Sequence, residues 1–430
     1  MERLAIIGFG CAGFQALKAL RESGCRAEID IYNDSAWPPY NPMLTTYYVK
    51  GKIPFQALFP FGNLDVIQSR YPATLHGETP VTAVAAKERR LRLGSREAGP
   101  YDRILITTGA RALLPPIEGL PGERLFSMRS VEDAVRLKEA LDGRALKKIL
   151  VIGASMVGIK IVELLLEQGV AVIFSDLAEH IFPTAAFETT GRKIEAQLRR
   201  KGLELRFGVS AQKAVEREGG YDISLSDDSV VTADAVVMCI GTRAATEMVD
   251  PAEIVVKRGI VVDERMRTSA EGIYAAGDCC EGPDLGLGAT RIIGLWANAA
   301  QQGTAAGLNM AGLERRYAGN ILHNITHFME TDFISFGDKS QPGQRRVFLE
   351  KGDQYVEATI DNERIVCLNI LNLFKNSGAI KNFLMRRLAE PDQPLDPQME
   401  AALLKSGLPR ELTAMLRAAD RKNNDSYFSS

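Results

Sequence analysis

The 430-residue sequence lacks any run of about eighteen apolar residues, the length that a helix needs to cross a bilayer. It also lacks an excess of either charge. Lysine and arginine total 52, aspartate and glutamate total 54, and the net charge of −2 gives no reason to expect nucleic acid or an acidic membrane as a partner. The apolar N-terminal stretch is broken by Gly8 and Gly10, so it fits a buried strand better than a signal peptide. We therefore expect a cytoplasmic protein.

Cysteine and histidine are sparse, and their spacing matches no common metal or redox motif. None of the six cysteines forms a CxxC pair, so neither a zinc site nor a thioredoxin-type pair is indicated. Cys279 and Cys280 are adjacent, and because a disulfide between neighbours is strained, we interpret both as reduced thiols. The four histidines are scattered and form no triad, so no metal is expected.

The chain is too long for a single hydrophobic core and predicts about two to four domains. Its first 35 residues follow the order strand, glycine turn, helix and strand, and the same order returns about 145 residues later. Each opening is typical of a doubly wound sheet. From about residue 320 to 388 the pattern changes to alternating strands and a closing helix. We predict an α/β fold with two doubly wound Rossmann-like domains and a smaller α+β C-terminal domain.

The first glycine motif runs from Gly8 to Gly13 as GFGCAG, after a strand and before a helix. In such a motif Gly8 makes the tight turn, Gly10 lets the backbone approach a pyrophosphate, and Gly13 lets the helix pack on the sheet, with Ala12 beside it. The phosphates then lie at the positive helix N-terminus. The next strand ends in Asn33 and Asp34. Both could be turn residues, but we favour Asp34 as the ribose ligand, with Asn33 as a helper.

The second glycine motif, GASMVG, has Gly153 and Gly158 at its ends and Ser155 in place of the middle glycine. A serine is tolerable there if the backbone needs no positive φ and the pyrophosphate clears one small side chain. The following strand ends in Asp176, which can accept hydrogen bonds from an adenosine ribose and repel a 2′-phosphate. Leu177 follows it, so no arginine is present to bind such a phosphate, and NADH is favoured over NADPH.

The order of GFGCAG, ITTGA, GASMVG, CIGTR and GIYAAGDC resembles the FAD-dependent pyridine nucleotide–disulfide oxidoreductase superfamily, over residues 3 to about 388. PPYNPML, MRSVEDA and LWANAAQQGTAAGLNMAG are most similar to its rubredoxin and ferredoxin reductase branch and to nitrite-reductase-like relatives. The resemblance implies an FAD-binding domain at 1–112 and 241–318, an NAD-binding domain at 113–240, and a C-terminal α+β domain at 319–388. The remaining tail, 389–430, is expected to be partly helical with a disordered end.

The resemblance also implies individual contacts to FAD and NADH. Backbone groups of Thr108 and Gly109 would contact the flavin nucleotide, and Val81 would contact its adenine. Arg129 would contact the flavin, and Asp278 would bind the ribityl chain or the pyrophosphate–ribose side of FAD. Trp296 would lie near the flavin ring, and Gly241 would line the NADH path. Alternatively, ITTG is simply the end of a strand and Trp296 is a core residue.

Three positions depart from the family pattern. The disulfide- and peroxide-reducing branches carry a cysteine in the loop after the first unit, where this chain has Pro42, so thiol chemistry beside the flavin is not expected. Many relatives pair a lysine in this loop with a glutamate just after the second glycine motif. In this chain the loop has Thr45 and Thr46 instead of the lysine, and Lys160 stands at the position of the glutamate. We expect Lys160 to face the flavin edge and to raise the reduction potential by stabilising the anionic reduced ring. A solvated helix lysine is the alternative interpretation.

The leading functional hypothesis is an FAD-dependent oxidoreductase that accepts hydride from NADH and passes electrons to a second acceptor. That acceptor is expected to be a small carrier such as ferredoxin or rubredoxin, or a small molecule. An NADH oxidase that uses oxygen is one alternative. A slow redox sensor or interaction protein, with residues 409–422 of the tail binding its partner, is another. A homodimer through the C-terminal domain is possible in any of these.

Overall fold

The structure is a computed structural model that describes residues 1–143, 146–361, 364–373 and 377–389, together with 397, 398, 401 and 405. The chain divides into two compact units. The first unit contains Met1–Ala112, Arg129–Ala134 and Thr242–Asn320, and the second contains Leu113–Met128, Val135–Gly241 and the residues from Ile321 onward. Residues 409–422, the tail segment of the sensor hypothesis, lie outside the described residues.

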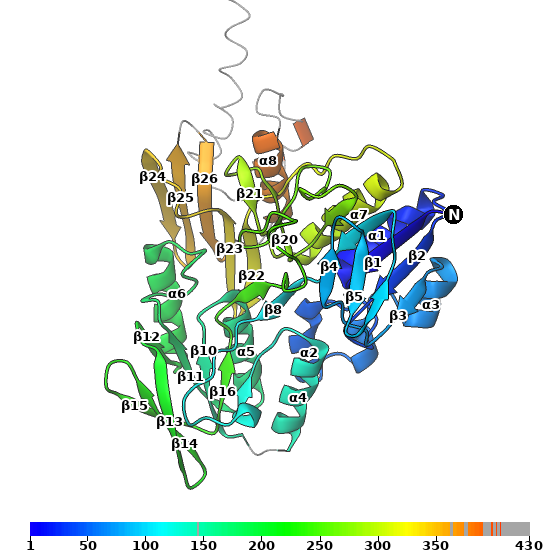
Figure 1. The fold of residues 1–430 in the computed structure, drawn as a ribbon. Coiled ribbons are helices and arrows are strands. Elements are labelled where there is room, and N and C mark those ends of the chain that lie inside the picture. Colours follow the sequence, from blue (N-terminus) through cyan, green and yellow to red (C-terminus); the bar gives the residue numbers. More distant parts are fainter. Residues whose placement is uncertain are drawn as a thin grey trace, which may run out of the picture. The chain divides into compact units, whose positions relative to one another are not determined.

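The first unit is built on a parallel five-stranded sheet with the strand order β19-β7-β1-β2-β3 (Figure 1). Both neighbours of β1 run parallel to it, and its apolar sequence RLAII is almost wholly buried, as expected for the central strand of a sheet covered on both faces. The elements of this unit are β1 (Arg3–Ile7), α1 (Cys11–Glu22), β2 (Glu28–Tyr32), η1 (Pro42–Leu44), α2 (Thr45–Val49), η2 (Phe55–Leu58), α3 (Leu64–Arg70), β3 (Thr74–His76), β4 (Ala83–Ala85), β5 (Arg90–Leu93), β6 (Arg96–Ala98), β7 (Arg103–Ile106), β8 (Ala110–Ala112), β17 (Thr242–Ala244), β18 (Ile260–Val261), β19 (Ile273–Ala275), β20 (Cys280–Asp284), β21 (Ala289–Arg291) and α7 (Trp296–Met310).

Helix α1 packs tightly against α7, and the two lie side by side in Figure 1. A β-carbon on Gly303 would lie 2.2 Å from the carbonyl oxygen of Ala12, and one on Gly307 would lie 2.5 Å from that of Ala16. The small residues of α7 therefore let two helix backbones touch. This contact presses α1 onto the sheet and positions the glycine loop from which α1 begins.

The second unit contains another parallel five-stranded sheet, in the order β12-β11-β10-β16-β9. A three-stranded antiparallel sheet, β13-β14-β15, is inserted in the sequence between β12 and β16 of that sheet. The elements are η3 (Gly122–Arg124), β9 (Leu125–Phe126), α4 (Val131–Asp142, which begins in the first unit), β10 (Lys148–Ile152), α5 (Met156–Glu167), β11 (Ala171–Asp176), α6 (Glu188–Arg200), β12 (Glu204–Phe207), β13 (Ala211–Arg217), β14 (Gly220–Leu225), β15 (Val230–Ala233) and β16 (Ala235–Met238).

The C-terminal segment adds an antiparallel five-stranded sheet in the order β22-β23-β26-β25-β24. Its elements are β22 (His323–Phe328), β23 (Thr331–Gly337), β24 (Arg345–Lys351), β25 (Gln354–Asp361), β26 (Arg364–Leu371) and α8 (Ser377–Ala389). Buried polar side chains join this sheet to the segment that enters α6. The Asn369 amide oxygen accepts a hydrogen bond of 2.7 Å from the backbone N–H of Phe187, and Thr190 donates one of 3.0 Å to Glu357. Because these groups are buried, they must stay paired, and they hold the sheet to α6.

Among the described residues, no helix is both long enough and apolar enough to span a bilayer.

Candidate nucleotide-binding loops

The three glycines of the first loop have different surroundings. A β-carbon on Gly8, whose φ is +93°, would lie 2.5 Å from the carbonyl oxygen of Thr107, and one on Gly13 would lie 2.3 Å from that of Gly8. Both positions therefore require glycine because backbone approaches them. A β-carbon on Gly10 would meet nothing within 4 Å. The space beside Gly10 is open, as a pyrophosphate lying against the backbone would require.

Helix α1 begins directly at this open space. No side chain caps its N-terminus, and its first turn contains no acidic residue. The unpaired N–H groups and the helix dipole therefore leave a positive end available to an anion. Ala12 is 5% exposed: its backbone lies against Gly303 of α7, and its side chain is packed near Gly277.

Asn33 and Asp34, at the end of β2, have different surroundings. Asn33 is 8% exposed, and its amide oxygen accepts a hydrogen bond of 3.1 Å from the backbone N–H of Phe9, inside the glycine loop. Its amide nitrogen donates to the carbonyl oxygen of Ser35 at 2.8 Å. Asn33 therefore braces the loop, a use that the sequence analysis did not assign. The side chain of Asp34 is 66% exposed, with a guanidinium nitrogen of Arg111 4.0 Å from its carboxylate, so it can accept hydrogen bonds from a ligand.

The ITTG segment lies beside the first loop. Thr107, which the sequence analysis did not single out, donates from its hydroxyl to the carbonyl oxygen of Gly8 at 2.7 Å. The Thr108 hydroxyl donates to the carbonyl oxygen of Ala245 at 2.6 Å. Gly109 has a φ of +70° and open space where a β-carbon would be. Val81 is buried just before β4.

Arg129 and Asp278, 149 residues apart in sequence, form a salt bridge of 2.7 Å. Their side chains are only 30% and 16% exposed, and the Arg129 Nε also donates to the carbonyl oxygen of Ala110 at 3.2 Å. The backbone N–H of Arg129 donates to Asp133 at 2.8 Å. The sequence analysis assigned each of the two residues separately to FAD. The structure brings them together as one ion pair.

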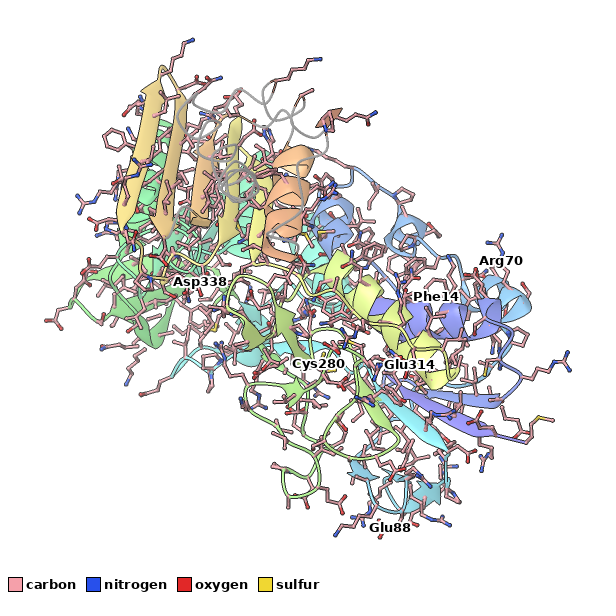
Figure 2. The ribbon with its side chains drawn as sticks, turned by 90° about the horizontal axis from the view of Figure 1, so that it is seen from above. Phe14, Arg70, Glu88, Cys280, Glu314 and Asp338 are labelled. Carbon is pink, nitrogen blue, oxygen red and sulfur yellow. The ribbon has the colours of Figure 1, made fainter. Side chains whose placement is uncertain are left out.

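Trp296 is the first residue of α7 and lies in an aromatic stack. Its ring is parallel to that of Phe61 at 5.7 Å, and Phe61 stacks on Phe14 of α1 at 4.1 Å; Figure 2 labels Phe14 on that helix. The stack joins the hydrophobic core of the first unit. The indole nitrogen of Trp296 is buried without a hydrogen-bond partner among the described residues.

The buried thiols of the first unit are poor nucleophiles. Burial, with a smaller contribution from Asp278, raises the pKa of Cys11 to about 12, and its sulfur donates to the carbonyl oxygen of Trp296. Burial raises the pKa of Cys279 to about 11 and that of Cys280, labelled in Figure 2, well above its ordinary value. Each sulfur lies within hydrogen-bonding distance of backbone carbonyl oxygens. Since the thiolate is the reactive form, these groups are unreactive near neutral pH.

The loop that holds a cysteine in thiol-dependent relatives folds here into η1 and α2. Pro42 is the first residue of η1, and the Thr45 hydroxyl donates to its carbonyl oxygen at 2.7 Å. Thr45 and Thr46 are both buried. Tyr40, just before, is also enclosed, and desolvation raises its pKa to about 12 despite the nearby Arg129.

The second loop repeats the close contacts of the first. A β-carbon on Gly153, whose φ is +111°, would lie 2.4 Å from the carbonyl oxygen of Cys239, and one on Gly158 would lie 1.9 Å from that of Gly153. Ser155 has an extended backbone, with φ of −94°, and caps α5 by accepting a hydrogen bond of 3.1 Å from the N–H of Gly158. Its hydroxyl donates to the carbonyl oxygen of Cys239 at 2.8 Å. Serine is therefore accommodated without a positive φ.

Asp176 closes this loop from the end of β11. One carboxylate oxygen accepts from the backbone N–H of Ala154 at 2.5 Å and the other from that of Ala178 at 2.7 Å. Leu177 beside it is 71% exposed. Gly241, with φ of +112°, has nothing within 4 Å of a β-carbon position.

Lys160 of α5 is engaged within the second unit. Its ammonium donates to the carboxylate of Glu163 and, at 2.9 Å, to the carbonyl oxygen of His327 on β22. Glu163, which the sequence analysis missed, also accepts from the backbone N–H of Met329 at 2.9 Å. Its position three residues after Lys160 on one helix face was the available signal. The pair ties α5 to the hairpin of β22 and β23, so the effect of Lys160 on the flavin stays a prediction.

Within the described part of the chain, no three histidine, cysteine or acidic side chains come together as a metal site.

Comparison with known proteins gives a consistent result. Residues 2–303 match the family described as pyridine nucleotide-disulphide oxidoreductase. The NADH-dependent phenylglyoxylate dehydrogenase subunit epsilon of Aromatoleum evansii is 25% identical over 388 residues, which are 89% of this chain and 91% of the relative. An NADH oxidase of Methanocaldococcus jannaschii is 27% identical over 321 residues, 73% of this chain and 71% of the relative.

Among solved structures, the covalent putidaredoxin reductase–putidaredoxin complex superposes with a TM-score of 0.83 at 21% identity, over 98% of this chain and 99% of that one. At that identity the likeness concerns the fold.

Proposed function

The chain belongs to the pyridine nucleotide-disulphide oxidoreductase family, and we propose that within it the protein transfers electrons from NADH, through bound FAD, to a separate protein carrier. Family membership makes it an oxidoreductase with FAD and NAD as cofactors. The carrier is a one-electron protein of the ferredoxin or rubredoxin kind.

We assign FAD to the first glycine loop and NADH to the second. Bound FAD supplies the chemistry that converts the two electrons of a hydride into single electrons. In the first unit, Gly10 and the N-terminus of α1 would hold the pyrophosphate, and Asp34 would hold a ribose. In the second unit, Ser155 and Asp176 shape the loop on which NADH would lie. The other glycines of each loop allow the close backbone contacts that hold the loop in its conformation.

Arg129 and Asp278 hold each other in the first unit beside the Thr108 segment. A carboxylate has about four acceptor sites, and the bond from Arg129 takes one of them. We therefore propose that Asp278 uses the others to orient polar groups of the flavin nucleotide. Trp296 would contribute packing behind the loop, through its stack with Phe61.

The absence of a redox cysteine at the Pro42 position, with buried thiols at Cys11, Cys279 and Cys280, is the single observation that carries the choice of acceptor. Pro42 begins a short helix where a redox cysteine would be, and Cys11, Cys279 and Cys280 are buried with raised pKa values. No cysteine occurs between residues 25 and 239. Without a reactive thiol in this loop, electrons do not leave through a disulfide beside the flavin, so we propose that they pass directly to another molecule.

The comparisons support a protein acceptor without naming one. One relative that covers most of this chain is described as a subunit of an NADH-dependent dehydrogenase, and a structural neighbour was solved with a small protein bound. The NADH oxidase relative keeps oxygen as the competing acceptor.

Steady-state kinetics of the FAD-loaded protein tests the proposal. NADH oxidation is followed with dichlorophenolindophenol, with oxygen alone, and with a panel of ferredoxins and rubredoxins coupled to cytochrome c. We expect fast dye reduction, carrier-dependent cytochrome reduction, and oxygen consumption at a small fraction of the dye rate. Oxygen consumption matching the dye rate would favour the oxidase. Slow turnover with every acceptor would favour a sensor.

A further inference from the structure

The first unit contains a cavity that none of the residues assigned above lines. Its volume is about 820 Å³, within the range of about 300–1,000 Å³ that small-molecule sites occupy. Three segments form its wall: the turn at Arg89, Asp102 and Arg103 where β7 begins, and residues between Val255 and Tyr274. The wall contains arginines, carboxylates, hydroxyls and apolar side chains, so the partners of these groups indicate what the cavity can bind.

Arg89 is an unpaired cation in this wall. Its side chain forms no hydrogen bond or ion pair with any described residue, although its Nε is buried. Glu88, the preceding residue of the same turn, is exposed and is labelled in Figure 2. Buried donors in proteins are almost always paired. An unpaired one in the wall of a cavity therefore indicates a group that binds a ligand.

The backbone of Arg89 is also unusual. Its φ of +48° lies in the left-handed region, which is uncommon for residues other than glycine. The residue closes the turn between β4 and β5 by donating its N–H to the carbonyl oxygen of Ala86 at 3.3 Å. Gly272 lies against its side chain, since a β-carbon there would be 3.2 Å from the Cδ of Arg89. Glycine or asparagine would form this turn more readily, so the strain is explained by the need for a guanidinium at the cavity.

The other two arginines of the wall already have partners. Arg267 bonds to Asp263 at 2.7 Å. Arg103 donates to the carboxylate of Glu2 and, at 2.9 Å, to the carbonyl oxygen of Met310. Among the described residues, Arg89 is therefore the one cation of the wall that is free to pair with a ligand.

The remaining polar groups of the wall limit the charge of that ligand. Asp102 accepts a hydrogen bond of 2.7 Å from the backbone N–H of Arg3, and the exposed Glu271 has no partner among the described residues. The hydroxyls of Tyr274 and Ser269 donate no hydrogen bond within the described part of the chain, so both can donate to a ligand. One free cation beside free carboxylates favours a ligand with a single negative charge, because further charges would be repelled.

Apolar side chains form another part of the wall. Val255 is 47% exposed, and Val261 and Ala270 are partly exposed. An inorganic anion would leave these surfaces in water. A ligand with an apolar body would cover them, and covering apolar surface is favourable.

We propose that this cavity binds a small organic carboxylate of single negative charge, with its carboxylate on the planar fork of Arg89 and its apolar body against Val255 and Val261. Strand β7 begins at the cavity with Arg103 and leads to Thr107, four residues and about 13 Å further on. The ligand is therefore an effector that lies apart from the first glycine loop. The proposal does not depend on which acceptor the protein reduces, so it can fail or succeed separately from the proposed function.

Isothermal titration calorimetry of the FAD-loaded protein with four probes tests the chemistry. The probes are benzoate, its neutral isostere benzamide, citrate and inorganic phosphate. We expect benzoate to bind at least tenfold more tightly than each of the others, because benzamide lacks the charge, citrate has too many charges for one cation, and phosphate lacks an apolar body. Absence of benzoate binding overturns the proposal, as does an affinity for benzamide, citrate or phosphate that equals or exceeds the affinity for benzoate.

Substitution of Arg89 tests the cation. Arg89→Gly removes the guanidinium and suits the positive φ, so it should unfold at or above the wild-type temperature while its affinity for benzoate falls to that for benzamide. Arg89→Lys keeps the charge without the fork, and its affinity should lie between those two. Arg92→Gln is the matched control, because Arg92 is exposed on β5 outside the wall; it should bind benzoate as wild type does. Wild-type affinity in Arg89→Gly overturns the proposal.

Narrowing the cavity tests the location. Val255→Trp leaves Arg89 unchanged and fills the space against which the apolar body would lie, so the affinity for benzoate should fall at least tenfold. Val66→Trp is the matched control, because Val66 is 40% exposed on α3, outside the wall. Equal affinity of the two tryptophan variants for benzoate contradicts the assignment to this cavity.

Discussion

Replacing Gly10 and Gly13 by alanine in turn separates binding from packing in the first loop. Gly13→Ala would place a β-carbon 2.3 Å from the carbonyl oxygen of Gly8, about 1 Å closer than an ordinary contact. The helix must shift against backbone on both sides, and overpacking of that kind costs about 1–3 kcal/mol. For a unit of this size, each kcal/mol lowers the unfolding midpoint by about 2–4 °C.

Gly10→Ala should behave in the opposite way. Its backbone has φ of −81° and ψ of −162°, which alanine adopts freely, and the new β-carbon meets nothing within 4 Å. The apoprotein should therefore melt at or slightly above the wild-type temperature, since alanine restricts the unfolded chain by about 0.4–1 kcal/mol. If the pyrophosphate of FAD lies in that space, the methyl group obstructs it. We expect FAD affinity to fall about 100-fold, equivalent to about 2.7 kcal/mol.

The assay is titration of apoprotein with FAD, followed by flavin fluorescence, together with thermal unfolding of the same apoprotein. Gly122→Ala is the control, because Gly122 also has open space and no positive φ, but lies far from the motif in sequence. It should leave FAD affinity unchanged and shift the unfolding midpoint no more than Gly10→Ala does. FAD affinity of Gly10→Ala equal to wild type would refute the reasoning, because the open space would then not be the phosphate site.

The remaining predictions concern specificity, thiols, Lys160 and pH. NADH should be oxidised far faster than NADPH, and Asp176→Ala combined with Leu177→Arg should shift the preference toward NADPH; equal use of both by wild type contradicts this interpretation. Iodoacetamide at pH 7.5 should leave NADH-to-dye turnover intact, since burial raises the pKa of thiols such as Cys11, to about 12 in that case, and loss of turnover with FAD retained would revive a thiol mechanism. Lys160→Glu should lower the unfolding midpoint by breaking a partly buried ion pair, and redox titration beside Lys160→Met decides its role, because unchanged flavin potentials would remove Lys160 from the cofactor's surroundings. Burial lowers the pKa of His323 below its ordinary 6.5, so the unfolded chain binds the proton more readily and stability is lost as pH falls below about 6.5. His323→Gln should therefore flatten the pH dependence of the unfolding midpoint between pH 7 and 5. An unchanged slope would contradict this assignment.

The features that sequence analysis recovered are those with local causes. A glycine that must allow a positive φ or a close backbone approach leaves its mark at one position, as Gly8 and Gly153 do. The alternation of apolar strands and helices reports the parallel sheets in the same way. The order of such motifs along the chain carries the resemblance to the family, which residues 2–303 confirm. The sequence also shows that α7 is a helix of small residues. It does not show that this helix packs against α1.

The uses of polar side chains depended on residues distant in sequence, and only the tertiary structure decided them. Asn33 is predicted to help Asp34 bind a ribose, and the structure shows that its amide also braces the glycine loop. Lys160 is predicted to face the flavin edge, and the structure bonds it to Glu163 and to a carbonyl oxygen 167 residues away. Arg129 finds Asp278 at a similar separation. A side chain's hydrogen-bonding capacity is consumed by whatever the fold brings within about 3 Å, and no local pattern records that. The edge position of β24 was likewise invisible in its sequence, because strand order is a property of the assembled sheet.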